Sequence, residues 1–296
     1  MALETSQLTD NLFIIVEKHR GRFPMSHSFL VRDEISALID TGCGIELLAE
    51  IKEAYKIDII INSHGHPDHS AGNYLFPDAA LHVPRMGAET HGRLEPLSRR
   101  FFPNETQAQW WRRWIKKTMG FEDREPTDFF DDGQVFDFGH VKLQAIHTPG
   151  HTMDHFCFLE LNSEVLLTFD IDLTPFGPWY GNLESSLKDF RSAIQKVRDL
   201  KPGIIASGHR LPIFKDVSMR IDKYEGVMDR RNQLIKTMLD RGLSRSDIIK
   251  SAPIYGHHKY ARDILPLFEE RMVDLHLEEM EELGMIRIEG EKIHVI

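Results

Sequence analysis

The sequence has few cysteines, no long apolar run and no excess of positive charge, and each shortage excludes a class of protein. Its two cysteines, Cys43 and Cys157, are too few for a disulfide framework or a Cys-based zinc site. No apolar run approaches the roughly 20 residues that span a bilayer, and the N-terminus lacks the basic and apolar regions of a secretory signal. A formal charge of −10 argues against indiscriminate binding to nucleic acid or anionic membrane. We therefore expect a cytoplasmic protein that does not bind membranes.

Histidine, in contrast, is abundant: the chain has 16, and several stand in one short run. Residues 64–69, which read HGHPDH, follow a branched apolar run at 57–61 whose length is typical of a buried strand. Gly65 and Pro67 stop this segment from continuing as a strand or a helix, so its side chains are expected to converge on one point. Imidazole and carboxylate together suit zinc, iron or manganese. The candidate metal ligands in this run are His64, His66, Asp68 and His69.

Three later strand-like runs also end in candidate ligands. His151 follows a Pro-Gly turn after an apolar run, and His209 follows a glycine after another. A third apolar run ends in two carboxylates, Asp170 and Asp172. A single His after a strand is more often a structural residue. Beside the HGHPDH run, however, a shared metal site at the ends of several strands is the better interpretation.

Together these segments resemble the metallo-β-lactamase fold superfamily over about residues 8–215. The resemblance rests on the HGHPDH run, the TPGHT segment at 148–152, the strand-ending Asp170 and the late Gly-His pair. It implies a mixed α/β (α+β) fold, an αββα sandwich with metals at one edge of two packed sheets. It assigns one metal to His64, His66 and His151, the other metal to Asp68, His69 and His209, and the bridge between them to Asp170.

The residue before the bridging Asp departs from the family pattern, which usually has glycine there. This sequence has Phe169 instead, so Asp172 stays open as a rival for the bridging position. If Asp170 is the bridge, Asp172 is expected to be a loop residue or a residue that supports the ligands.

The ligand set implies two divalent metal ions, most readily Zn²⁺, with Fe or Mn as alternatives. Such a pair is expected to hold a bridging hydroxide that attacks a carbonyl or phosphoryl centre. Asp68 is the expected catalytic residue, which orients the hydroxide and carries a proton to the leaving group. All the ligand positions are filled, so an enzyme is favoured over a metal or ligand sensor.

The favoured function is hydrolysis of a thioester, ester or lactone of a small acidic metabolite, as in glyoxalase-II-like members of the superfamily. One alternative is a metal-dependent nuclease or phosphodiesterase. Another is a mononuclear iron oxygenase that acts on persulfides, because that branch keeps most of the same ligands. The acidic net charge weighs against nucleic acid as a substrate.

The chain divides into two expected domains. Residues 1–216 are expected to form the catalytic domain, with a lid-like insertion at 86–131, and residues 217–296 a small, mostly helical, winged-helix-like domain. Expected strands of the first domain lie at 12–16, 28–31, 35–39, 57–61, 80–83, 141–146, 155–159, 165–169 and 203–206, and its expected helices at 44–55 and 187–199.

The C-terminal region has a helical pattern at 218–241, 244–251 and 261–283, followed by two short strands at 285–288 and 292–295. From residue 217 to the end, 15 acidic residues stand against 13 basic ones. A winged helix that grips phosphate should be clearly basic. A role in packing, in covering the substrate or in forming a homodimer is therefore favoured over binding nucleic acid.

Three aromatic or polar segments are candidates for the substrate pocket. In the insertion, Trp110 and Trp114 are expected to share a helix face, within a stretch from 93 to 117 that has seven basic residues against two acidic ones. This helix is interpreted either as a lid over an apolar substrate with a negative group or as a surface packed on the body or a second subunit. The remaining tentative pocket residues are Phe176, Trp179 and Tyr180 in the loop after Asp170, and His257 in the C-terminal region.

Overall fold

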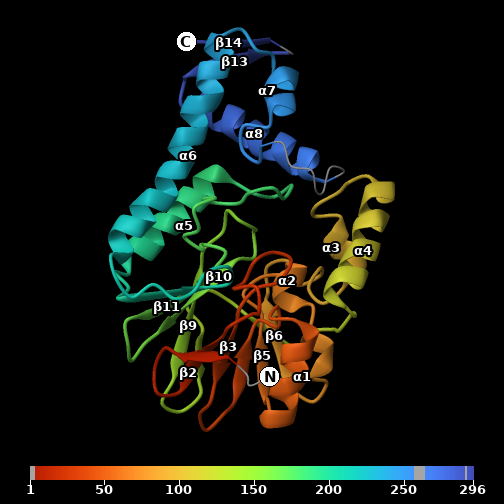
Figure 1. Cartoon of the computed structure of the whole chain (residues 1–296), viewed down its shortest axis with the longest axis vertical. Coiled ribbons are helices and arrows are strands. Elements are labelled where there is room, and N and C mark those ends of the chain that lie inside the picture. Colours follow the sequence, from red (N-terminus) through yellow and green to blue (C-terminus); the bar gives the residue numbers. More distant parts are fainter. Residues whose placement is uncertain (1–3, 257–263, 291) are drawn as a thin grey trace.

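The computed structural model describes residues 4–256, 264–290 and 292–296. Two β-sheets pack face to face, and helices cover the outer face of each sheet (Figure 1). The expected αββα arrangement is therefore present. Within the described parts of the chain, no helix is both long and apolar enough to cross a membrane.

The two sheets have seven and five strands. Strands of the first sheet are β1 (Thr5–Gln7), β2 (Leu12–Ile15), β3 (Ser28–Val31), β4 (Ala37–Ile39), β5 (Ile59–Ile61), β6 (Ala80–Pro84) and β7 (Asp128–Phe130). Strands of the second are β8 (Val135–Asp137), β9 (Lys142–His147), β10 (Phe156–Glu160), β11 (Val165–Phe169) and β12 (Ile204–Ser207). The first sheet follows chain order and is parallel from β4 to β7, whereas the second has the order β12-β11-β10-β9-β8 with only β11 and β12 parallel.

Side chains along each strand point alternately to the two faces of its sheet, and this alternation explains the layers. Ile39 and Ile61 point into the core between the sheets, while their neighbours Leu38 and Ile60 point to the other face, where they pack under α1 (Ile45–Ala54). In the second sheet, Leu167 faces the core between the sheets, and the preceding residue packs under α5 (Leu187–Asp199). Because both faces of these strands are buried, they read as continuous apolar runs.

The strand ends bring the candidate ligands to one edge. The HGHPDH run follows β5 and continues into the short helix α2 (Pro67–Ser70), while His151 comes after β9, Asp170 directly after β11 and His209 after β12. The neighbouring parallel strands β11 and β12 end at the same edge of their sheet. Four segments that are far apart in the sequence therefore meet where the two sheets open.

The insertion at 86–131 contains α3 (Leu94–Ser98) and α4 (Glu105–Met119), which pack against each other, and then β7, which joins the first sheet. The buried face of α4 consists of Ala108, Trp111, Ile115 and Met119. Trp110, in contrast, is 38% exposed, and Trp114 is half-buried. Trp111 occupies the inward position, and Trp114 packs at the edge of the same apolar cluster.

The described residues of the C-terminal region form three helices and an antiparallel hairpin, the element order expected from the sequence. These elements are α6 (Val217–Asp240), α7 (Arg245–Ser251), α8 (Leu265–Glu282), β13 (Ile286–Glu289) and β14 (Lys292–Val295). Helix α6 is long and leaves the sandwich beside α5 to reach the hairpin (Figure 1). Its first half packs into the core under α5, and its second half packs with α7, α8 and the hairpin.

Candidate metal centre

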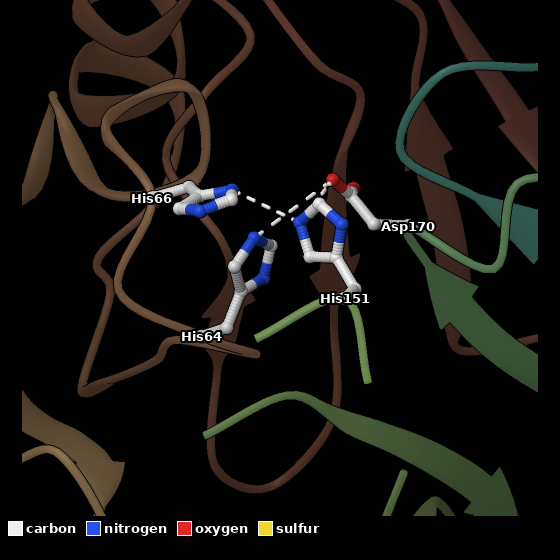
Figure 2. Close-up of side chains that lie close together, drawn as sticks. All are labelled: His64, His66, His151 and Asp170. Atoms are coloured by element: carbon white, nitrogen blue, oxygen red, sulfur yellow. Dashed lines mark hydrogen bonds and ion pairs between the residues drawn. The ribbon is translucent and has the colours of Figure 1, made fainter. Parts of the chain in front are cut away.

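The candidate ligands converge at the sheet edge as two neighbouring groups. Within each group, one possible ligand atom from every residue lies within 4.8 Å of the others. Figure 2 shows the first group, in which three imidazole rings and a carboxylate point toward one another. The first group is His64, His66, His151 and Asp170, and the second is Asp68, His69 and His209.

Asp170 faces both groups. One carboxylate oxygen, Oδ2, lies 2.9 Å from Nε2 of His151. The other, Oδ1, lies 2.9 Å from Nε2 of His69 and 3.3 Å from Nε2 of His209. Asp172 belongs to neither group and accepts a hydrogen bond from the Thr174 N–H. The geometry therefore favours Asp170 for the position between two metal ions.

Phe169 explains how this carboxylate reaches the centre without the usual glycine. Its φ angle is +47°, in the left-handed region that glycine adopts without strain. The pairing of β11 with β12 shifts register between Leu167 and Phe169, so the chain turns at this point. The Phe169 ring is fully buried and packs edge-on against Phe29 and Phe158. This packing holds the turn in place.

Backbone carbonyls orient two of the histidines. Nδ1 of His151 donates to the Trp179 carbonyl at 2.9 Å, and Nδ1 of His209 donates to the Gly21 carbonyl at 2.6 Å. An imidazole that donates from Nδ1 carries a free lone pair on Nε2 when it is neutral. In both rings Nε2 is the nitrogen that faces Asp170. The outer partners thus select the form of each ring that can bind a metal.

Asp40, which the sequence analysis did not single out, orients the ligands of the HGHPDH run. Its Oδ2 lies 2.7 Å from Nδ1 of His69 and accepts a hydrogen bond from the Ser63 hydroxyl at 2.8 Å. That hydroxyl is also 3.0 Å from Nδ1 of His64. Asp40 and both rings are completely buried. One carboxylate therefore sets the orientation of ligands from both groups.

His66 is oriented from the opposite side of the centre. Its Nδ1 faces Nε2 of His151 at 2.9 Å, and its Nε2 lies 2.7 Å from the side-chain amide nitrogen of Asn182. An amide offers both donors and an acceptor to an imidazole. If His66 Nδ1 held a metal, the proton of the neutral ring would lie on Nε2, and the Asn182 amide, turned over, would offer its oxygen as the acceptor. Asn182 is completely buried.

The donor atoms at the centre fit a metal cation. Among the described residues, Nε2 of His64 is buried and makes no hydrogen bond, and Nε2 of His69 and Oδ1 of Asp170, although 2.9 Å apart, are not aligned as a hydrogen bond. Buried polar atoms nearly always have a partner, so three that converge on one place indicate a missing ligand. Burial and the neighbouring histidines hold the pKa of His64 well below its usual range, as burial also does for His66. Neutral imidazole is the form that binds metals.

Asp68 belongs to the second group. Its Oδ2 lies 3.4 Å from Nε2 of His209 and 3.9 Å from Nε2 of His69. Its side chain is 7% exposed. The carboxylate thus lies beside the centre and keeps limited access to solvent, which suits the predicted role in proton transfer.

Asp154 is a further residue that the sequence analysis missed. It is completely buried, and its Oδ2 accepts hydrogen bonds from the Gly65 N–H at 3.1 Å and from Arg100 Nη1 at 3.0 Å. Nε2 of His91 lies 2.6 Å from the same oxygen. Although burial alone would raise it, Arg100 and His91 hold the pKa of the Asp154 carboxyl well below its usual range. This ionic cluster ties the insertion to the glycine between ligands His64 and His66.

The tentative pocket residues lie at different distances from the centre. The Trp179 ring is 5.4 Å from the His151 ring and 5.8 Å from the His66 ring. Phe101, which was not among the tentative pocket residues, lies 5.1 Å from the His66 ring. Phe176 is 38% exposed and lies beside Tyr255.

Tyr180, Trp110 and Trp114 make their contacts with other parts of the protein. Tyr180 is completely buried, and its hydroxyl contacts His276 and Arg231 in the C-terminal helices. Trp110 is on the exposed side of α4, and Trp114 stacks on Phe23 with ring centres 6.0 Å apart. His257 lies outside the described residues.

Comparisons with known proteins agree with this fold. A family model described as the metallo-beta-lactamase superfamily matches residues 21–209. A metallo-beta-lactamase family protein from Thermus thermophilus superposes with a TM-score of 0.73 at 20% identity, covering 97% of this chain and 99% of that one. A beta-lactamase domain protein from Burkholderia ambifaria gives 0.72 at 16% identity, covering 99% and 93%. Both likenesses in fold extend through the C-terminal helices.

Relatives in sequence are distant. Lactamase-like protein adaB from Aspergillus niger is 24% identical over 251 residues, which are 82% of this chain and 68% of that protein. Acyl-coenzyme A thioesterase MBLAC2 from Homo sapiens is 26% identical over 55% of this chain and 64% of its own length. Atrochrysone carboxyl ACP thioesterase from Emericella nidulans is 28% identical over 69% and 57%. The chain thus spans less than two thirds of either thioesterase.

The family model covers well over half of the 296 residues and includes every candidate metal ligand. Its span begins at Gly21, whose carbonyl orients His209, and ends at His209 itself. On this match and on the two-sheet fold, the chain belongs to the metallo-beta-lactamase superfamily.

Proposed function

We propose that this protein is a metal-dependent hydrolase that cleaves a thioester of a small acidic metabolite, with ester and lactone bonds as the nearest alternatives. The observation that carries the proposal is the orientation of five imidazoles by outer partners, which leaves one nitrogen of each directed at a common centre. Two relatives are named as thioesterases, which favours the thioester among these bonds. The donor set suits two divalent ions, most readily Zn²⁺.

When bound, divalent metal ions would lower the pKa of a water molecule to about 7 and polarise the carbonyl of the substrate. The chain's own residues complete the chemistry. Asp170 neutralises both halves of the centre, and Oδ2 of Asp68 is positioned to take a proton and pass it to the leaving thiolate. Burial raises the pKa of the Cys43 and Cys157 thiols to about 12, so neither is suited as a nucleophile.

Aromatic rings beside His66 favour a substrate with an apolar part. Phe101 and Trp179 lie against the His66 ring, and Phe268 of α8 lies 5.3 Å from Trp179. Phe101 is 9% exposed, while Trp179 and Phe268 are half-buried. Such rings exclude water from one side of the centre and offer a surface to an acyl chain.

The basic residues of the insertion are compensated only in part within the protein. Arg100 is buried in the cluster with Asp154, and its charge is internally compensated. Two other arginines of this stretch are also paired, Arg99 with Glu95 and Arg112 with Glu105, but both glutamates were already subtracted in the count from the sequence. Of these pairs, only those of Arg100 reduce the excess of positive charge, so the acidic net charge of the whole chain stays the main argument against nucleic acid.

Turnover of three substrates tests the proposal: an acyl-coenzyme A thioester, a lactone and a short RNA. We expect metal-loaded protein to hydrolyse the thioester, and His66→Ala to reduce that rate at least about 100-fold, because a metal ligand is lost while the core stays intact. His140→Ala is the matched control, since the His140 side chain is 78% exposed and its ring pairs with Asp33, and neither residue belongs to the groups of candidate ligands. Unchanged turnover in His66→Ala would contradict the proposal. Cleavage of RNA alone, or oxygen uptake with a persulfide, would replace it by one of the alternatives.

A further inference from the structure

We propose that the C-terminal helices α6 and α8 are a structural part of the metal centre. Through Arg231 and Arg271 they hold the loop at 176–185, and this loop orients the ligands His66 and His151. The inference concerns how the centre is built, so it rests on the centre binding metal and not on which bond the enzyme cleaves.

The loop contacts both ligands directly. The Trp179 carbonyl accepts the hydrogen bond from Nδ1 of His151 at 2.9 Å, and the Ser185 hydroxyl donates to the backbone carbonyl of His151 at 2.8 Å. The side-chain amide of Asn182 lies 2.7 Å from His66 Nε2. The loop therefore fixes the ring and the backbone of one ligand and the ring of another. Outer partners of this kind determine how tightly a site binds its metal.

The loop needs support from outside because it has little structure of its own. Residues 170–186 form no helix or strand between β11 and α5. Prolines and glycines recur along them, at Pro175, Gly177, Pro178 and Gly181, which disfavours regular structure. A segment of this length without secondary structure keeps one conformation only where other elements hold it.

Arg231 of α6 supplies most of that support. It is 6% exposed, and its guanidinium donates three hydrogen bonds of 2.7 Å: to the Phe176 carbonyl, the Pro178 carbonyl and the Tyr180 hydroxyl. The cation also lies over the Phe176 ring, 4.8 Å from its centre. A buried guanidinium must satisfy its donors, so the arginine and these carbonyls fix each other. The supported residues lie on both sides of Trp179.

Helix α8 holds the same loop at its other end. Arg271 donates to the carbonyls of Asn182, Leu183 and Ser185 at 3.2 to 3.4 Å. His276, five residues further along α8, contacts the Tyr180 hydroxyl at 2.7 Å. Both helices lie beyond residue 209, where the match to the family model ends. The C-terminal region of this chain therefore contributes contacts that the matched part alone does not supply.

Arg231→Met tests the inference, because methionine keeps an apolar side chain of moderate length and removes the charge and the donors. We expect this variant to bind metal about 10- to 100-fold more weakly than the parent protein, measured by chelator competition. We also expect the visible absorption bands of the cobalt-substituted protein to shift, because His151 is no longer held in place. Arg245→Met is the matched control: Arg245 pairs with Asp274 and Glu270 within the C-terminal region, and its loss should leave affinity and spectrum unchanged.

A general loss of stability would not shift the cobalt spectrum of the folded protein, so the spectrum separates support of the centre from support of the fold. Should Arg231→Met fail to fold, Arg271→Met gives the same test, since Arg271 is 24% exposed and its removal leaves no buried charge unpaired. Parental affinity and spectrum in the folded arginine variants would overturn the inference. Weakened binding in Arg245→Met equal to that in Arg231→Met would also overturn it. Neither result depends on finding the substrate.

Discussion

Asp170 is the residue on which both halves of the centre depend. Its carboxylate lies 2.9 Å from His151 of the first group on one side and 2.9 Å from His69 of the second group on the other, and so it joins the two groups. Its backbone is fixed as well: the N–H donates to His155 Nε2, and the carbonyl accepts from the Tyr224 hydroxyl of α6. Because the backbone of Asp170 is held on both sides, its side chain loses little conformational entropy when a metal binds.

The two neighbouring carboxylates should therefore differ in their effect on metal content. We expect Asp170→Ala to lose most of the bound metal, and Asp172→Ala to keep most of it, because Asp172 lies outside both groups of candidate ligands. Elemental analysis of the two purified variants measures this directly. The reverse order would assign the bridge to Asp172.

Phe169 offers a test of backbone strain at the same turn. Removing its fully buried ring should cost about 3–5 kcal/mol of stability in either of two variants. Alanine at φ +47° keeps strain of about 1–2 kcal/mol that glycine does not have. Glycine also loses more conformational entropy on folding than alanine, which offsets part of this advantage. Phe169→Gly should therefore be more stable than Phe169→Ala by about 1 kcal/mol.

Denaturant unfolding of the two Phe169 variants, each without metal, gives the comparison. The more usual order, with the alanine variant the more stable, would show that the left-handed turn is not retained once the ring is gone.

At the scale of elements, the insertion is attached to the centre more firmly than a hinged lid would be. Arg100 and His91 of the insertion meet Asp154, and Arg100 also pairs with Glu184 of the loop at 176–185. The Leu183 N–H donates to the Arg100 carbonyl in addition. A buried ionic cluster of this kind resists opening, because separating its members leaves charges without partners.

Asp154→Asn should break this cluster. We expect a loss of about 3–5 kcal/mol of unfolding free energy, because Arg100 keeps a buried charge with one partner fewer, and a lower metal content as the Gly65 N–H loses an ionic acceptor. Asp137→Asn is the control: this carboxylate is 55% exposed and pairs with Lys142 at the surface, so its loss should cost at most about 1 kcal/mol. Chemical denaturation and elemental analysis measure both effects. Equal stabilities in the two variants would show that the cluster is incidental.

The ligand-bearing strands could be predicted because their signal is local. An apolar run, a break and a ligand lie within a few residues of each other, and β5, β9, β11 and β12 all follow that pattern. The short strands β7 and β8 were not predicted. Asp128 and Phe129 of β7 are exposed, and so are two of the three residues of β8, so neither strand shows a clear apolar pattern.

The outer partners of the ligands could not be predicted in the same way. Asp40 and Asn182 reach their histidines across 29 and 116 positions of sequence, and no local pattern encodes such a meeting. The Trp179 and Gly21 groups that orient His151 and His209 are backbone carbonyls, which every residue has. Asp154 offered a weak signal, as an acidic residue in an apolar segment three positions after a ligand.

At the scale of the whole molecule, the C-terminal region has a core of its own and also shares a core with the sandwich. Val217, Ile221 and Met228 of α6 pack in the same cluster as Leu187 and Phe190 of α5. The C-terminal region is therefore joined to the sandwich by a shared apolar core as well as by Arg231 and Arg271. Its winged-helix character, a homodimer and a cytoplasmic location stay predictions.

The central claim is that the converging residues form a metal centre, and metal content per chain tests it most directly. Elemental analysis of protein purified without added metal should find about two divalent ions per chain, because both groups of ligands are complete and share Asp170. His66→Ala should retain clearly less. Parent protein that holds no metal, even after incubation with zinc, iron or manganese salts, would contradict the account.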